Sequence, residues 1–219
     1  ALGAAATRVS LADLSANGIY LAFLGALALW GWIELAFLSG VVTGPNRVPC
    51  PPFARTSQRF WRAVGTIAWH ETLLVVVLCA LGLLTIGAEN PFALGTFALL
   101  FFARVSAKLN LFFGVPRINT QFLPKPLSHL PSHFRIGRIT AFFPISVSAL
   151  TVFSALLLER AINVNHPGMA VGYSLMTCLC LLALLEHWFM VLPLPDEKLW
   201  RWMIPAQKNL SITPQKDLE

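Results

Sequence analysis

Five apolar segments, each long enough to cross a lipid bilayer as a helix, constrain the fold of this chain more than any other feature. A helix needs roughly 20 residues to span the hydrocarbon core. The segments cover residues 18–42, 63–86, 92–113, 139–158 and 169–192. Charged residues make up 12% of the chain, about half the share of a soluble domain, and the mean hydropathy is +0.67. The sequence therefore predicts an all-α fold, a polytopic transmembrane helix bundle.

Residues 1–202 are predicted to form a single transmembrane helical domain, and residues 203–219 a polar cytoplasmic tail. The first residues are typical of the end of an apolar helix followed by an exported loop. We therefore expect further helices to precede the five that this sequence covers.

Lys and Arg residues fall mainly on one side of the predicted bundle. Twelve of them lie in the 44–62 loop, the 114–138 loop and the segment after residue 192, whereas the opposite side has only Arg8 and Arg160. Short loops rich in Lys and Arg stay in the cytoplasm, so the C-terminus is predicted to be cytoplasmic. The net charge of +6 is thus a sign of topology, and the absence of nucleic-acid-binding motifs predicts no nucleic acid partner.

Basic and aromatic residues are predicted to form an interface on the cytoplasmic side. They are Arg47, Arg55, Arg59, Arg62, Trp200 and Trp202. Arginines there suit lipid headgroups or an acidic partner, and tryptophans suit an aromatic belt. The 114–138 loop alternates apolar residues with proline and is expected to lie along the membrane interface. We assign His129 and His133 in it to that interface and not to zinc, since Pro131 interrupts a helix between them.

Eight polar residues lie inside the predicted helices, most of them roughly 10 Å below the cytoplasmic surface at 1.5 Å of helix per residue. They are Glu34, His70, Glu71, Arg104, Lys108, Asn110, Glu186 and His187. Ionisable groups in hydrocarbon are costly, face the bundle interior and mark candidate functional sites. We expect these side chains, which come from four helices, to form one buried polar layer.

Several roles for this layer remain open from the sequence. Arg104 and Lys108 could pair with two of the three glutamates in an internal ion-pair network, which would keep the charges ionised. A metal site would use the carboxylates and imidazoles of Glu34, His70, Glu71, Glu186 and His187. The adjacent His-Glu and Glu-His pairs do not match the Glu-x-x-His spacing of di-iron bundles. In a third role, His70 or His187 would ligate the magnesium of a chlorophyll. The remaining alternatives are proton transfer and binding of a quinone-like ligand.

No soluble-type active-site motif is present in the sequence. It has no G-x-S-x-G, Walker, H-E-x-x-H or G-x-G-x-x-G pattern in a suitable context. A conventional soluble-type active site is therefore not expected.

Several long motifs resemble the PuhE family of photosynthetic complex assembly proteins. They are WGWIELAFLSGVVTGPNRVPCPP, WHE at 69–71, RVSAKLNLFFGVP, FLP at 122–124, FPISV and LLEHWFMVLPLPDEKLWRW. The resemblance runs from about residue 18 to residue 202 and includes every residue of the polar layer. It implies an integral protein of the bacterial inner, photosynthetic membrane, encoded among genes for the reaction centre and for bacteriochlorophyll synthesis. It also implies further helices before Ala1, and it carries over no catalytic residue.

The leading hypothesis is a non-enzymatic membrane protein that assists assembly of, or remains bound as an accessory subunit to, a reaction centre and light-harvesting complex. Its helices would pack against those partners through small residues such as Gly18, Gly25, Gly82 and Ala149. The alternative is an intramembrane metal- or pigment-dependent enzyme or carrier in bacteriochlorophyll maturation. The cofactors to consider are bacteriochlorophyll, a carotenoid or a metal ion.

Overall fold

The computed structural model describes residues 1–120 and 123–193 of the chain. The described residues form six α-helices and two short 3₁₀ helices. They are α1 (Leu2–Ser10), α2 (Ala16–Leu38), α3 (Thr56–Leu84), α4 (Phe92–Phe113), η1 (Lys125–Leu127), η2 (Leu130–His133), α5 (Phe142–Asn163) and α6 (Pro167–Phe189). In these two ranges β-structure is limited to one bridge between Val115 and Ile136. The predicted all-α fold is confirmed.

The helix ends differ from the predicted ones where local chemistry outweighs hydropathy. Helix α2 ends at Leu38, four residues early, because Gly40 adopts a positive φ of 79° and glycine tolerates the left-handed conformation that stops a helix. Helix α3 begins at Thr56, seven residues early, and the Gln58 side chain accepts a hydrogen bond from the Arg55 N–H. The first turn of α3 is polar, so a prediction from apolar residues alone places the start of the helix too late.

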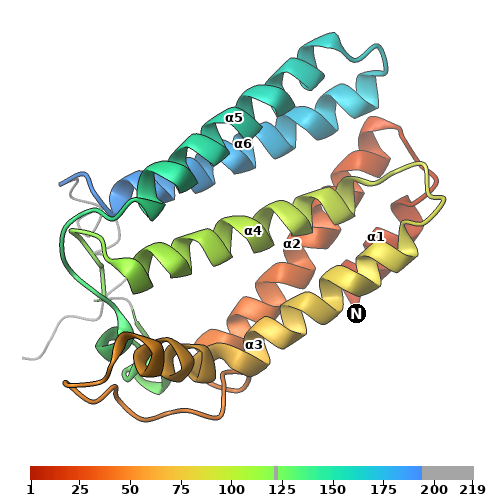
Figure 1. Ribbon diagram of the computed structural model, residues 1–219. Coiled ribbons are helices and arrows are strands. Elements are labelled where there is room, and N and C mark those ends of the chain that lie inside the picture. The colour runs from red at the N-terminus through yellow and green to blue at the C-terminus, as the bar shows by residue number, and fades with distance from the viewer. Residues whose placement is uncertain (121–122, 194–219) are drawn as a thin grey trace, which may run out of the picture.

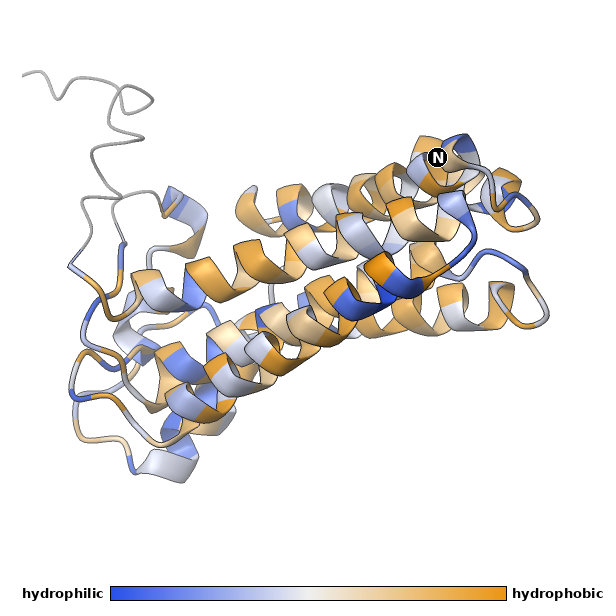
Figure 2. Ribbon diagram, turned by 90° about the horizontal axis from the view of Figure 1, so that it is seen from above, coloured by the Kyte–Doolittle hydropathy of each residue, from blue (hydrophilic) through white to orange (hydrophobic). Residues whose placement is uncertain are grey.

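The long helices run side by side (Figure 1). Helices α5 and α6 form a closely packed hairpin, α1 packs on α2, and α4 lies between the hairpin and the group formed by α2 and α3. Figure 2 shows that hydrophobic residues dominate the helices, while hydrophilic ones gather in the loops at the ends. Five helices, α2 to α6, are long and apolar enough to cross a membrane. The protein is therefore a multi-pass membrane protein.

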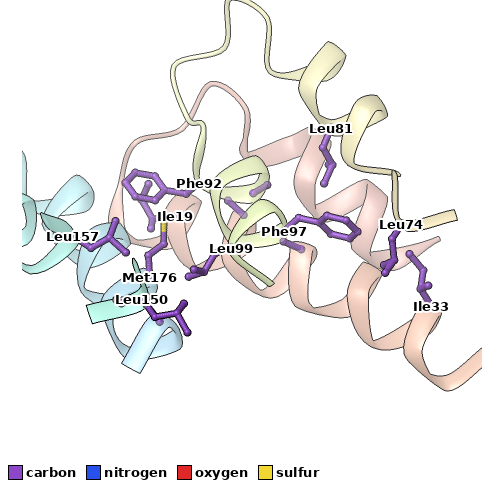
Figure 3. Close-up of a cluster of buried hydrophobic side chains, with 14 residues drawn as sticks. Ile19, Ile33, Leu74, Leu81, Phe92, Phe97, Leu99, Leu150, Leu157 and Met176 are labelled. Atoms are coloured by element: carbon purple, nitrogen blue, oxygen red, sulfur yellow. Dashed lines mark hydrogen bonds between the residues drawn. The ribbon is translucent and has the colours of Figure 1, made fainter. Parts of the chain in front are cut away.

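The core is apolar and depends on close helix approach. Figure 3 shows Phe97 and Leu99 of α4 between Leu74 of α3 on one side and Leu150 and Met176 of the hairpin on the other. All five are buried. Large apolar side chains also face outward, as lipid-facing residues do. They include Trp32, Leu35, Trp69, Phe102 and Leu182.

Two of the small residues that were expected to face partner helices instead pack against other residues of this chain. Gly25 lies against α1, where an added Cβ would be 2.9 Å from the Thr7 hydroxyl. Gly18 is buried against Asp13. Ala149 is exposed and Gly82 has open space where a Cβ would be, so these two of the four remain available for packing against another protein.

Candidate functional site

Six residues of the predicted polar layer converge in one cluster. Arg104 of α4 lies between two carboxylates: its Nη2 is 3.6 Å from Glu34 Oε2 of α2, and its Nη1 is 3.6 Å from Glu186 Oε1 of α6. One turn along α4, the Lys108 Nζ donates a hydrogen bond to Glu71 Oε1 of α3. His70 Nε2 lies 3.6 Å from Glu34 Oε1. We call these six residues the ion-pair cluster, and it links α2, α3, α4 and α6.

The imidazole of His70 is the most enclosed group of the cluster. Its side chain is 0% exposed, and its ring lies 4.4 Å from the Phe37 ring, centroid to centroid. Glu71 Oε1 is 4.0 Å from His70 Nε2, so one imidazole faces two carboxylates. Neither ring nitrogen makes a hydrogen bond with the described residues.

A segment of the 39–55 loop holds this part of α3 in place. The His70 N–H donates to the Thr43 carbonyl at 3.0 Å, and the Asn46 N–H donates to the Gly65 carbonyl at 3.0 Å. The Asn46 side chain also donates to the Arg62 carbonyl at 2.9 Å. Gly44 lies between these contacts, in direct backbone contact with α3. The loop therefore fixes the position of the His70–Glu71 pair.

Asn110 and His187 lie outside the ion-pair cluster and have other partners. His187 is fully buried. Its Nδ1 is 2.8 Å from the Ala183 carbonyl, which can only accept, so Nδ1 carries a proton. In the neutral imidazole Nε2 then accepts from the Ser106 hydroxyl at 3.0 Å. The Asn110 amide donates to Ser146 Oγ of α5 and to the Ser106 carbonyl, each at 3.0 Å. Ligation of magnesium by His187 would require loss of its bond to Ser106.

The arrangement fits an ion-pair network better than a metal site. Two cations, Arg104 and Lys108, lie against the carboxylates of Glu34, Glu71 and Glu186. Among the residues described by the structure, no three His, Cys, Asp or Glu side chains group as metal ligands would. A metal held by all three carboxylates would compete with both cations for them.

Two cavities border the ion-pair cluster, and sequence analysis did not predict either. One of about 630 Å³ lies between α3, α4 and residues 116–119 and 123–136, and the ends of α2 and α6 also line it. The other, of about 320 Å³, is lined by residues of α2, α4 and α6. Arg104 and Glu186 line both cavities, so their ion pair lies between the two. The apolar residues of the 114–138 loop could have indicated that this loop covers a cavity, because Leu127 and Leu130 are buried against Phe37.

The end of the bundle that carries residues 39–62, 114–120 and 123–141 is called here the basic end. Arg47 and Arg55 are exposed there. Arg59 donates to the Phe112 carbonyl at 2.8 Å, and Arg62 donates to the Pro49 carbonyl at 3.4 Å. The two other residues of the predicted interface, Trp200 and Trp202, lie outside the described residues.

His129 and His133 are buried under the basic end, although the sequence placed them along the membrane interface. Burial lowers the pKa of both imidazoles below its usual value near 6.5. Below that pH the unfolded chain therefore binds more protons than the folded protein, so stability falls as the pH drops from about 6.5 toward the folded pKa values. We expect the Tm in detergent to drop between about pH 7.5 and 5.5, and to drop less in H129Q/H133Q.

Wild type and H129Q/H133Q are compared at the same two pH values. An equal difference in H129Q/H133Q would show that the two buried imidazoles do not contribute.

Comparison with known proteins assigns the chain to a family. Residues 1–211 match the family model described as "Protein of unknown function (DUF3623)". A relative from Rhodobacter capsulatus, described as "Uncharacterized 30.4 kDa protein in puhA 5'region", is 58% identical over 197 residues, which is 90% of this chain and 72% of the relative. No solved structure matches the chain. The protein is therefore a member of the DUF3623 family.

Proposed function

We propose that this protein assists assembly of, or remains bound as an accessory subunit to, a bacterial photosynthetic reaction centre and light-harvesting complex. The observation that carries the proposal is the position of the relative's gene in the 5' region of the photosynthesis gene puhA. The resemblance to the PuhE family supports the same role. The protein would then lie in the inner, photosynthetic membrane with its basic end and C-terminus in the cytoplasm.

The fold offers surfaces suited to this role. Outward-facing apolar residues such as Trp32 and Trp69 provide area for packing against other transmembrane helices, and Gly82 and Ala149 provide places for close approach. The ion-pair cluster joins four helices, and its carboxylates are paired with cations of the same chain. In this proposal the ion-pair cluster is structural and holds the partner-binding helices in register.

Deletion of the gene in its phototrophic host tests the proposed function. We expect lower reaction-centre and antenna absorption in the near infrared from isolated membranes, restored by the wild-type gene. The double variant K108M/E71Q removes one complete ion pair and should also restore absorption if the ion-pair cluster is structural. Unchanged absorption after deletion would contradict the assembly role.

Metal analysis distinguishes the proposed function from the alternative, which is a metal- or pigment-dependent enzyme or carrier in bacteriochlorophyll maturation. Stoichiometric iron or zinc in the purified protein, lost in E34Q, would favour the enzyme. Failure of K108M/E71Q to restore absorption despite normal protein levels would point the same way. The pairing of Glu71 with Lys108 favours the structural role.

A further inference from the structure

The larger cavity has apolar walls and lies at the basic end of the bundle. Its volume of about 630 Å³ falls within the range of sites that enclose small molecules. Aromatic and aliphatic side chains from α3, α4 and the 114–138 loop dominate the lining, among them Phe60, Val64, Leu111, Phe112, Leu127 and Phe134. Such walls favour a hydrocarbon chain.

The inner boundary of this cavity does not favour an anionic group. Arg104 and Lys108 line it, but Arg104 lies against Glu34 and Glu186, and Lys108 is bound to Glu71. Three carboxylates thus offset two cations there. A negatively charged ligand group would therefore bind elsewhere.

Arginines near the cavity supply positive charge at the basic end. Arg117 lines the cavity, and the Arg59 guanidinium lies 4.5 Å from the centroid of the Phe112 ring, which also lines it. The Arg135 N–H donates to the carbonyl of Leu111, which lines the cavity, at 2.9 Å, and the charge of Arg135 acts on Arg59. Residues 39–62 and 114–141 contain eight Lys or Arg residues and no Asp or Glu. Arg59, Arg117 and Arg135 have no carboxylate partner within residues 1–120 and 123–193.

We propose that this cavity binds one anionic phospholipid, with an acyl chain between α3 and α4 and the phosphate at Arg59, Arg117 and Arg135. The lipid satisfies both features at once, because its chain matches the apolar walls and its headgroup matches the excess positive charge. Each arginine near an anionic headgroup strengthens binding about fivefold. A free phosphate ion would gain nothing from the apolar walls.

Native mass spectrometry of the full chain in mild detergent tests this site. We expect one phosphatidylglycerol to remain bound per chain, with at least about tenfold preference over phosphatidylcholine from the arginine contacts. R117Q/R135Q should lose most of that preference. R138Q should keep it, because Arg138 neither lines the cavity, as Arg117 does, nor acts on Arg59, as Arg135 does. Equal retention of the two lipids, or displacement of the lipid by inorganic phosphate, would overturn the proposal.

Filling the cavity provides an independent test. A63F adds a ring at a residue that lines the cavity and should abolish retention of phosphatidylglycerol. A149F adds the same ring on the exposed face of α5 and should leave retention unchanged. If A63F does not fold, V64W fills the cavity from the next residue. Wild-type retention in a folded cavity-filling variant would show that the lipid binds elsewhere.

Discussion

Replacing Lys108 with Met lowers the free energy of unfolding by about 3 kcal/mol, because the Glu71 carboxylate loses its partner in a region largely closed to water. The two side chains are 20% and 24% exposed. Removal of one member of a buried pair leaves an uncompensated charge, whereas removal of both leaves none. The double variant K108M/E71Q should therefore recover most of the lost stability and lie within about 1 kcal/mol of the wild type. Equilibrium unfolding in mixed micelles measures all three proteins.

An exposed ion pair of the same chain provides the control. Glu159 and Arg160 lie 3.8 Å apart at the end of α5, with side chains 56% and 72% exposed. E159Q should change the free energy of unfolding by less than about 0.5 kcal/mol, because water screens such pairs. A similarly small effect of K108M would contradict the structural role of the ion-pair cluster.

Replacing Gly44 with Ala destabilises the protein by about 2–3 kcal/mol and separates the 39–55 loop from α3. An added Cβ would lie 2.7 Å from the Thr66 carbonyl carbon and 2.9 Å from the Ala68 nitrogen. These are backbone atoms of a helix, which cannot shift without strain, and overpacking costs of this size are typical. The hydrogen bond from His70 to Thr43 should weaken with it. Equilibrium unfolding and hydrogen exchange at the His70 amide measure the two effects.

Gly82 of the same helix is the matched control. It has open space where a Cβ would be added, and alanine is favoured over glycine within a helix by up to about 1 kcal/mol. G82A should therefore be as stable as the wild type or more stable. If G44A were equally harmless, the loop would not be held as the structure shows.

The sequence was sufficient to predict the spanning helices, and the structure shows why their ends were less predictable. Helix α4 begins and ends at the predicted residues because its apolar stretch coincides with the helix. Helix α5 extends through Glu159 and Arg160 to Asn163, beyond its apolar stretch. A helix continues while its backbone hydrogen bonds can form, and hydropathy does not report those bonds.

The convergence of the polar layer could also be predicted, but the pairing within it could not. Depth along each helix placed Glu34, Arg104 and Glu186 at one level, and the structure brings them together. Asn110 and His187 instead bond to Ser146 and Ser106, two hydroxyls that carried no signal in the sequence. Which side of each helix faces which neighbour depends on packing, and packing is a property of the whole fold.

The two cavities and the docking of the Thr43–Asn46 segment on α3 escaped prediction for the same reason. Both depend on contacts between residues far apart in the chain, such as the bond from Asn46 to the Arg62 carbonyl. A run of glycine, proline and asparagine indicates a turn. It does not indicate which helix that turn contacts.

Isolation of the tagged protein from its native membranes tests the proposed function most directly. The cells are collected while photosynthetic complexes are being made, their membranes are lightly crosslinked, and the near-infrared absorption of the purified material is recorded. The proposal predicts the bands of a reaction centre or antenna together with their subunits. A colourless preparation that lacks those subunits, or the spectrum of a single free pigment, would contradict it.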